Sequence, residues 1–175
     1  MAFLLKNDKS NRRLAGQSVL QQWIQVSRPT LALPQATNQQ LFRIYGGRVL
    51  VHALLGEVTT VIEGTDPVPT IDYAALTDAS LLVGTEYALA STLNIASDEV
   101  GTLYSVEGDG TAINAGNQVA GSVELLTPGF VLAQGQITFA CSGSRTGAIK
   151  WDLWYQPLDS GAFVDAIEVA TVKIS

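Results

Sequence analysis

Short runs of apolar and β-branched residues follow one another from Leu41 onwards, separated by glycine, proline or acidic turns. The first runs, in LFRIYGGRVLVHALLGEVTTVI, flank the pair Gly46-Gly47, and glycine accepts the positive φ that a tight hairpin turn requires. Runs of this length and spacing are typical of all-β sandwiches. The pattern therefore predicts strands over 41–45, 48–55, 57–63, 81–94, 100–106, 119–126, 129–133, 136–142, 147–155 and 163–174.

The segment AIKWDLWYQ, residues 148–156, shows the clearest alternation of apolar and polar positions. Its odd-numbered residues are all apolar, which is the period of a half-buried strand. Trp154 falls on the polar face beside Asp152, so it is expected either to cover a loop or to anchor a partner. Pro157 is expected to end the strand, because proline has no N–H to donate to a sheet.

Other stretches of the body have turn residues or an irregular pattern. TDPVPTID, residues 65–72, carries two prolines and is predicted to cross between two sheets. GDGTAINAGNQ, residues 108–118, is predicted to be a surface loop. SGSRTG, residues 142–147, is predicted to be a turn between strands, with an anion site at its amides and Arg145 as the alternative. Within SLLVGTEYALASTLNIA, residues 80–96, we expect strands buried on both faces, with a helix as the alternative.

Residues 1–40 precede this body and contain no convincing hairpin. Ala15, Val19, Trp23 and Val26 fall at helical spacing, which favours a short amphipathic helix. The neighbouring apolar and amide residues leave an extended alternative open.

The stretch RPTLALP is predicted to be irregular and extended. Pro29 and Pro34 each fix their own φ and push the preceding residue towards extended geometry. We therefore predict an extended N-terminal arm over residues 1–40, able to lie across a neighbouring molecule, and one β-sandwich body over residues 41–175. A partly disordered tail is the alternative for the arm.

Charge divides the chain at about the same point. The net charge of -6 combines a basic leader with an acidic body: residues 1–50 hold seven basic residues and one acidic residue, a net charge of +6. Residues 51–175 hold three basic and fifteen acidic residues, a net charge of -12. A cationic leader on an anionic body is suited to docking on an acidic surface or on a neighbouring copy.

Membranes and nucleic acids are not expected partners. No stretch approaches the roughly 18 uninterrupted apolar residues of a membrane span, and MAFLLKNDKSNRR shows no signal peptide, so we expect synthesis in a cytoplasm. The cations of the leader are spread out, whereas a tail that tracks phosphates favours a dense run of lysine and arginine. With only 15% charged residues, the surface is expected to be partly apolar and to face another protein.

The sequence contains no common catalytic motif. His52, the single histidine, lies within a predicted strand and lacks a matching nucleophile motif, so a structural role is favoured. Cys141, the single cysteine, shares a strand face with Ile137 and Phe139 and is expected to be a buried thiol. No enzymatic activity and no cofactor are predicted.

Acidic residues in two turns raise the question of a calcium site. Asp98 and Glu99, together with Glu107 and Asp109, could supply oxygen ligands to a hard cation. Their spacing fits no twelve-residue calcium loop, so solvated turn carboxylates are favoured and no metal site is predicted.

Three blocks of the sequence resemble one family of viral proteins: FRIYGGRVLVHALLGEVTT, GTLYS at residues 101–105, and CSGSRTGAIKWDLWYQPLD at residues 141–159. They are similar to head decoration or cement proteins of tailed bacteriophages, over about residues 40–160. The resemblance implies a β-sandwich of jelly-roll type that assembles as a homotrimer on the outside of an icosahedral capsid. It implies no catalytic residues.

Pattern, charge and resemblance together predict a capsid cement protein of the virion exterior, whose partners are the major capsid protein and further copies of itself. The alternative is a phage fibre, spike or head-fibre module that binds host glycans through Trp154, Tyr104 and loop acids. The residues expected to contact a partner are Arg12, Arg13, Trp23, Ile24, Arg28, Leu31 and Leu33 in the arm, and Arg43, Arg48 and Trp154 in the body.

Overall fold

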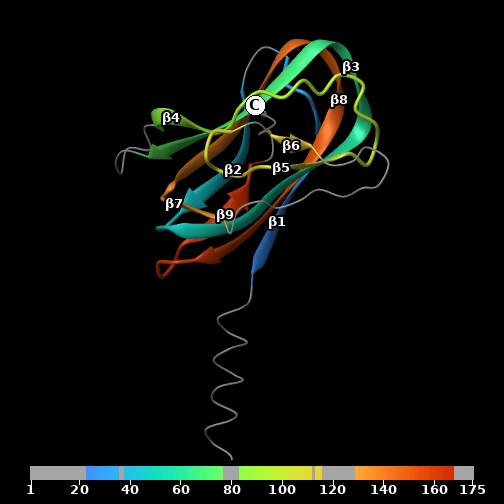
Figure 1. Ribbon diagram of the computed structural model, residues 1–175. Coiled ribbons are helices and arrows are strands. Elements are labelled where there is room, and N and C mark those ends of the chain that lie inside the picture. The colour runs from blue at the N-terminus through green and yellow to red at the C-terminus, as the bar shows by residue number, and fades with distance from the viewer. Residues whose placement is uncertain (1–22, 36–37, 77–82, 112, 116–128, 168–175) are drawn as a thin grey trace, which may run out of the picture.

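The computed structural model describes residues 23–35, 38–76, 83–111, 113–115 and 129–167, and within these ranges every regular element is a β-strand (Figure 1). All strand pairs are antiparallel and form one sheet that is nearly closed into a barrel. The predicted all-β antiparallel class is confirmed, whereas the jelly-roll sandwich stays a prediction. The strands are β1 (Ile24–Ala32), β2 (Gln39–Tyr45), β3 (Val49–Leu76), β4 (Val83–Ala90), β5 (Leu103–Ser105), β6 (Asn114–Ala115), β7 (Phe130–Leu132), β8 (Gly135–Pro157) and β9 (Phe163–Ala166).

A ribbon of two long strands, β3 and β8, forms the centre of the sheet. Its ladder covers β3 from Val49 to Ala75, and both strands bend near the middle (Figure 1). Phe139 and Trp151 lie twelve residues apart on β8, which would span roughly 40 Å of straight strand. Their ring centroids are 5.5 Å apart, so the two halves of the ribbon face each other and enclose the core.

Shorter strands widen each half of the folded ribbon. In one half, β7 and β5 pair with the first part of β3, and β1 pairs with the last part of β8. In the other half, β4 pairs with the last part of β3, while β2 and then β9 extend the sheet beside the first part of β8. The barrel is therefore built from contacts between residues far apart in the sequence.

Residues 142–147 have the composition of a turn because they lie where the ribbon of β3 and β8 bends. These residues lie inside the continuous strand β8, so the predicted turn between two strands is wrong. Gly143 and Gly147 have φ values of 80° and 113°, and a Cβ at Gly143 would lie 2.4 Å from the carbonyl oxygen of Asp66. The glycines allow β8 to bend and approach β3 closely, which a side chain would prevent.

The predicted crossover at residues 65–72 is also wrong, because these residues belong to β3. The ladder with β8 shifts register between Thr65 and Val68, on either side of Pro67. A β-bulge removes one residue from the ladder, so a proline without an N–H is tolerated there.

Gly46 and Gly47 form a turn, with φ values of 72° and 150°, but the strands on either side do not pair. β2 pairs with β8 and β9, whereas the start of β3 pairs with the opposite half of β8. The turn therefore connects the two halves of the barrel, and the predicted hairpin is wrong. A Cβ at Gly46 would lie 2.3 Å from the carbonyl oxygen of Gly161, so the turn packs against the loop before β9.

The N-terminal region joins the body earlier than residue 40. Residues 24–32 form β1, so the predicted helix is wrong from Ile24 onwards; its residues 15–22 lie outside the described part of the chain. The predicted irregular stretch starts within β1, where a register shift between Arg28 and Leu31 accommodates Pro29. Leu33 is 2% exposed and belongs to the core. From Ile24 onwards the chain is thus part of the body.

The remaining predictions differ from the structure mainly in strand length. The helix alternative within residues 80–96 is wrong, because residues 83–90 form β4. The expected burial on both faces is also wrong, because Tyr87 on β4 is 75% exposed. The predicted loop over residues 108–118 contains the two-residue strand β6. The predicted strands 48–55, from residue 49, and 57–63 are parts of β3, and those at 136–142 and 147–155 are parts of β8. The strand predicted over 100–106 shortens to Leu103–Ser105, and that over 163–174 shortens to Phe163–Ala166 in its described part. The range 119–126 lies outside the described residues.

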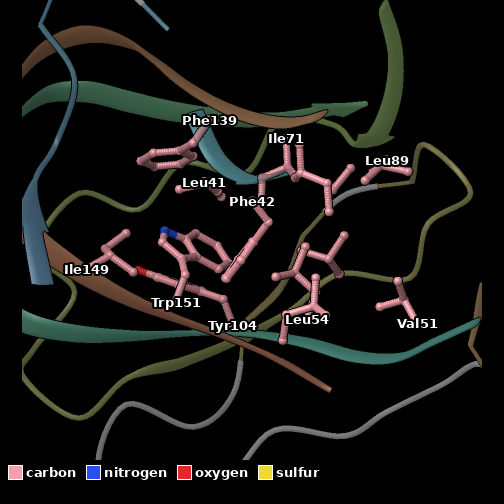
Figure 2. Close-up of a cluster of buried hydrophobic side chains, with 14 of the residues drawn as sticks. Leu41, Phe42, Val51, Leu54, Ile71, Leu89, Tyr104, Phe139, Ile149 and Trp151 are labelled. Atoms are coloured by element: carbon pink, nitrogen blue, oxygen red, sulfur yellow. The ribbon is translucent and has the colours of Figure 1, made fainter. Parts of the chain in front are cut away.

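The core lies between the two halves of the folded ribbon (Figure 2). Trp151 is 1% exposed and sits at its centre near Phe139 and Ile149. Gly56 lies on the paired strand opposite Trp151, and a Cβ there would lie 2.8 Å from the indole ring. Every apolar residue of the alternating segment at 149–155 that was predicted to share a face is buried, so that prediction is confirmed.

Candidate partner-binding surfaces

An exposed tryptophan stands where β1 begins. Trp23 is 56% exposed and stacks on His52, with ring centroids 4.3 Å apart and an interplanar angle of 18°. β1 and β3 lie on opposite sides of β8, at a separation of about 10 Å. The side chain of Trp23 therefore reaches across β8, which anchors the start of β1 while leaving much of the indole open to solvent.

A polar network on β1 and β8 continues this outer face. Asp152 is 9% exposed and accepts hydrogen bonds from the hydroxyl of Ser27 and, at 3.3 Å, from Gln25. Its carboxylate also lies 2.9 Å from the ammonium group of Lys150. Burial alone raises the pKa of Asp152, but the hydrogen bonds from Ser27 and Lys150 outweigh it and hold the pKa below its ordinary value. The network fixes β1 on β8.

The predicted partner-binding residues of the arm differ in how far they are exposed. Trp23 and Ile24 are exposed and remain candidates for a partner contact. Arg28 is 1% exposed and its Nε donates a hydrogen bond to the carbonyl oxygen of Ile167 at 3.1 Å; burial lowers its pKa. Arg28 and the core residue Leu33 therefore hold the chain to its own body. Leu31 is half-buried, and Arg12 and Arg13 lie outside the described residues.

Arg48 forms an ion pair within its own chain. Its guanidinium donates to both carboxylate oxygens of Asp159, at 2.9 and 2.8 Å, and its backbone N–H donates to the same carboxylate at 2.7 Å. The hydrogen bonds from Arg48 lower the pKa of Asp159 to about 2. The ion pair ties the turn between β2 and β3 to the loop before β9, so Arg48 acts within the fold.

The other two predicted body residues are partly covered. Arg43 lies over the ring of Tyr45, with its guanidinium carbon 5.3 Å from the ring centroid, and Tyr45 stacks on Phe163 at 5.0 Å. Trp154 is half-buried on the outer face of β8, opposite Gln25. Both alternatives for Trp154, a cover over a loop and an anchor for a partner, stay predictions.

The Arg48–Asp159 pair predicts a specific response to pH. Because the pKa of Asp159 is lower in the folded protein than in the unfolded chain, its contribution to stability is complete above about pH 4 and is lost as the pH falls towards about 2. The variant Asp159→Asn is therefore expected to melt below the wild type at pH 6, and the difference in melting temperature should shrink as the pH falls from 4 to 2. A difference that stays constant from pH 6 to pH 2 would contradict this role.

Of the four acids considered for calcium binding, Glu99 and Asp109 are exposed as expected, whereas Asp98 and Glu107 are buried, so the expectation of solvated carboxylates is wrong for these two. Tyr104 is 1% exposed and its hydroxyl donates to Asp98 at 2.5 Å; burial and this hydrogen bond raise the pKa of Tyr104 well above its usual range. Glu107 is also buried and accepts a hydrogen bond from Ser105. Within the described ranges no three His, Cys, Asp or Glu side chains gather to hold a metal. A buried Tyr104 is not available to a glycan.

Two further sequence candidates are accounted for by packing. Arg145 is 9% exposed and donates to the carbonyl oxygens of Pro34, Gln35 and Gly143, so its guanidinium fastens the segment after β1 and the anion alternative is not supported. Cys141 is buried, and this burial raises the pKa of its thiol, in agreement with the predicted structural role.

The extended alternative for this part of the chain is confirmed at Ile24 and Gln25, which lie in β1. In WIQVSR, residues 23–28, apolar Ile24 and Val26 alternate with polar Gln25 and Ser27, which is the period of a strand. The helical spacing of Trp23 and Val26 competed with this alternation, and the sequence contains no sign that Trp23 reaches His52 on a distant strand.

No helix in the described part of the chain is long and apolar enough to cross a membrane. In comparisons with known proteins, no family model, no curated protein and no solved structure matches this chain.

Proposed function

We propose that this protein is a decoration protein of a tailed-phage head, which binds the outside of the assembled capsid and stabilises it. The resemblance of three sequence blocks to this family supports the proposal. The blocks fall on β2, β3, β5 and β8, strands that form the centre of the sheet. The geometry of the described residues supports a binding role, since their histidine, cysteine and buried acids are used in packing and hydrogen bonding.

The distribution of cations carries the proposal. The described residues contain five cations, and each contacts its own chain: Arg28, Arg43, Arg48, Arg145 and Lys150. Twelve acidic residues in the same ranges leave the body strongly negative. The other basic residues of the leader, Lys6, Lys9, Arg12 and Arg13, fall within residues 1–22, which carry a net charge of +3. We assign this segment to the attachment of the acidic body to an acidic capsid surface.

Stabilisation follows from mass action. A protein that binds the assembled lattice but not free subunits stabilises the lattice by RT ln(1 + [L]/Kd), and this free energy is repeated at every occupied site. Assembly as a homotrimer adds multivalency, because three leaders on one trimer act at a high effective concentration. Weak individual contacts are then sufficient for tight decoration.

Heads that lack this protein are expected to release their DNA at a lower temperature than complete heads. The stabilising free energy of all bound copies is absent in depleted particles, and adding purified protein should restore the original release temperature. Fluorescence of a DNA-binding dye during heating measures the release. Equal release temperatures for depleted and complete heads would refute the proposal, and binding to host cells but not to heads would favour the glycan-binding alternative.

A further inference from the structure

Exposed apolar side chains gather at one end of the barrel. Phe163 pairs with Tyr45 and is 47% exposed, and Val131 pairs with Leu50 and is 56% exposed. Leu158 is 45% exposed, and its backbone N–H donates a hydrogen bond to the carbonyl oxygen of Arg48. All three thus lie beside the turn at Gly46-Gly47. We call this region, which also includes Trp23 and Ile24 at the start of β1, the turn end (Figure 1).

The connection of the turn end to Trp23 and Ile24 follows from strand register. Ile24 lies opposite Tyr155 on β8, and Tyr155 lies opposite Val51 on β3, close to the turn. Of the seven large hydrophobic side chains that are exposed in the described residues, five therefore belong to the turn end; the other two are Tyr87 and Val100. Apolar area concentrated in this way marks an interaction surface.

The opposite end of the barrel, at the bend of the ribbon, is acidic. Glu63 and Asp66 lie at the bend and are exposed. Glu99 is also exposed. It lies near Glu63, because the backbone of Ile62 exchanges hydrogen bonds with the backbones of Ser97 and Asp98. Arg145, the nearby cation, donates to backbone carbonyls of its own chain. The turn end carries most of the exposed large apolar side chains, with Asp165 exposed on β9 and Asp159 paired with Arg48. The bend carries three exposed acids and none of the large exposed apolar side chains of the turn end, so the two ends differ in character.

The basic leader is attached at the apolar end. Residues 1–22, with a net charge of +3, connect directly to Trp23. A segment of this length reaches up to about 70 Å when extended, so its cations can act on a surface that the turn end touches. Apolar contact and positive charge are thus offered together at one end, while the acidic bend is held away from it.

We propose that the turn end is the face that docks on the capsid, and that the occupant is a capsid-protein surface with an apolar patch surrounded by acidic groups. This proposal rests on the proposed decoration function and adds the orientation of the bound molecule. The apolar side chains supply the desolvated centre of the contact, and the leader supplies complementary charge around it. The acidic bend then points away from the capsid.

Two substitutions of the same kind at sites of equal exposure test the orientation. Val131→Glu places a charge in the turn end, and Val100→Glu places the same charge at a residue that is 57% exposed elsewhere, against 56% for Val131. Val131→Glu is expected to weaken binding to phage heads by about thirtyfold, the effect of losing a central interface residue, whereas Val100→Glu should bind like the wild type. Leu158→Glu is a second test at the turn end.

Cosedimentation of each full-length variant with heads measures the binding, circular dichroism checks folding, and analytical ultracentrifugation measures self-association. Equal binding of Val131→Glu, Leu158→Glu and wild type would overturn the orientation while leaving the decoration function standing. Failure of the wild type itself to bind heads would refute the decoration function. Loss of the trimer with unchanged binding to heads would show that copies of the protein meet at the turn end, which also overturns the proposal.

Discussion

Replacing Trp151 with alanine is expected to lower the free energy of unfolding by about 3–5 kcal/mol, the cost of removing a large aromatic side chain from a core. Trp151 is 1% exposed and contacts both halves of the folded ribbon, since its ring lies 5.5 Å from that of Phe139 and directly against Gly56. Its loss would leave a cavity between the two halves. Urea unfolding followed by circular dichroism measures the change.

The contact with Gly56 makes this prediction sharper. Gly56→Ala places a Cβ 2.8 Å from the indole and is expected to cost about 1–3 kcal/mol through overpacking. In a Trp151→Phe background the smaller ring leaves room for the methyl group, so Gly56→Ala should cost less there. Equal costs of Gly56→Ala in the two backgrounds would contradict the packing described here, because residues in contact are coupled in a double-mutant cycle.

The sequence predicted those parts of the fold that depend on local alternation. The face shared by Ile149, Trp151, Leu153 and Tyr155 was predicted from period two, and all four side chains are buried. The buried thiol of Cys141 was predicted from the same alternation. Such positions are predictable because neighbours in a strand decide which face a side chain takes.

Pairings between distant strands were not predictable in this way. Gly46 and Gly47 correctly indicated a turn, yet nothing nearby shows that β2 and β3 enter opposite halves of the barrel. Gly143, Gly147 and Pro67 have the composition of a loop, but they lie at the bend and at a bulge of two very long strands. Tertiary pairing satisfies the backbone there and overrides the local preference for a turn.

The contacts of the predicted partner-binding residues were also not predictable from local sequence. Arg28 and Arg48 were expected to meet a partner because they belong to the basic N-terminal part of the chain, which is suited to docking on an acidic surface. In the fold, Arg28 bonds to the carbonyl oxygen of Ile167, and Arg48 pairs with Asp159, more than one hundred residues away. Only the pairing of distant strands brings these groups together, so the sequence contained no local sign of either contact.

Removing residues 1–22 is expected to weaken binding to phage heads by roughly thirtyfold or more. Four ion pairs with capsid acids, at about 0.5 kcal/mol each, correspond to roughly that factor in the dissociation constant of a single chain, and a trimer multiplies the effect. The truncated chain begins at Trp23 and keeps β1, Leu33 and the Arg145 contacts. Its free energy of unfolding should therefore stay within about 0.5 kcal/mol of the wild type.

Substitutions at the adjacent residues Arg12 and Arg13 separate the effect of the leader's charge from the effect of its length. The full-length double variant Arg12→Glu with Arg13→Glu is expected to bind nearly as weakly as the truncated chain, whereas Arg12→Lys with Arg13→Lys should bind almost like the wild type. Added salt should weaken the wild type more than the truncated chain, since exposed charges are screened over about 10 Å at 0.1 M ionic strength. Identical salt dependence of the two proteins would show that the leader's charges take no part.

The role of the leader in attachment can be tested by cosedimentation of the full-length and truncated proteins with phage heads stripped of this protein. We expect the full-length protein to saturate the heads, whereas the truncated protein, equally stable and folded, should stay largely in the supernatant at the same concentration. Saturation of the heads by both proteins would contradict the assigned role of the leader, and failure of both to bind would contradict the decoration function itself.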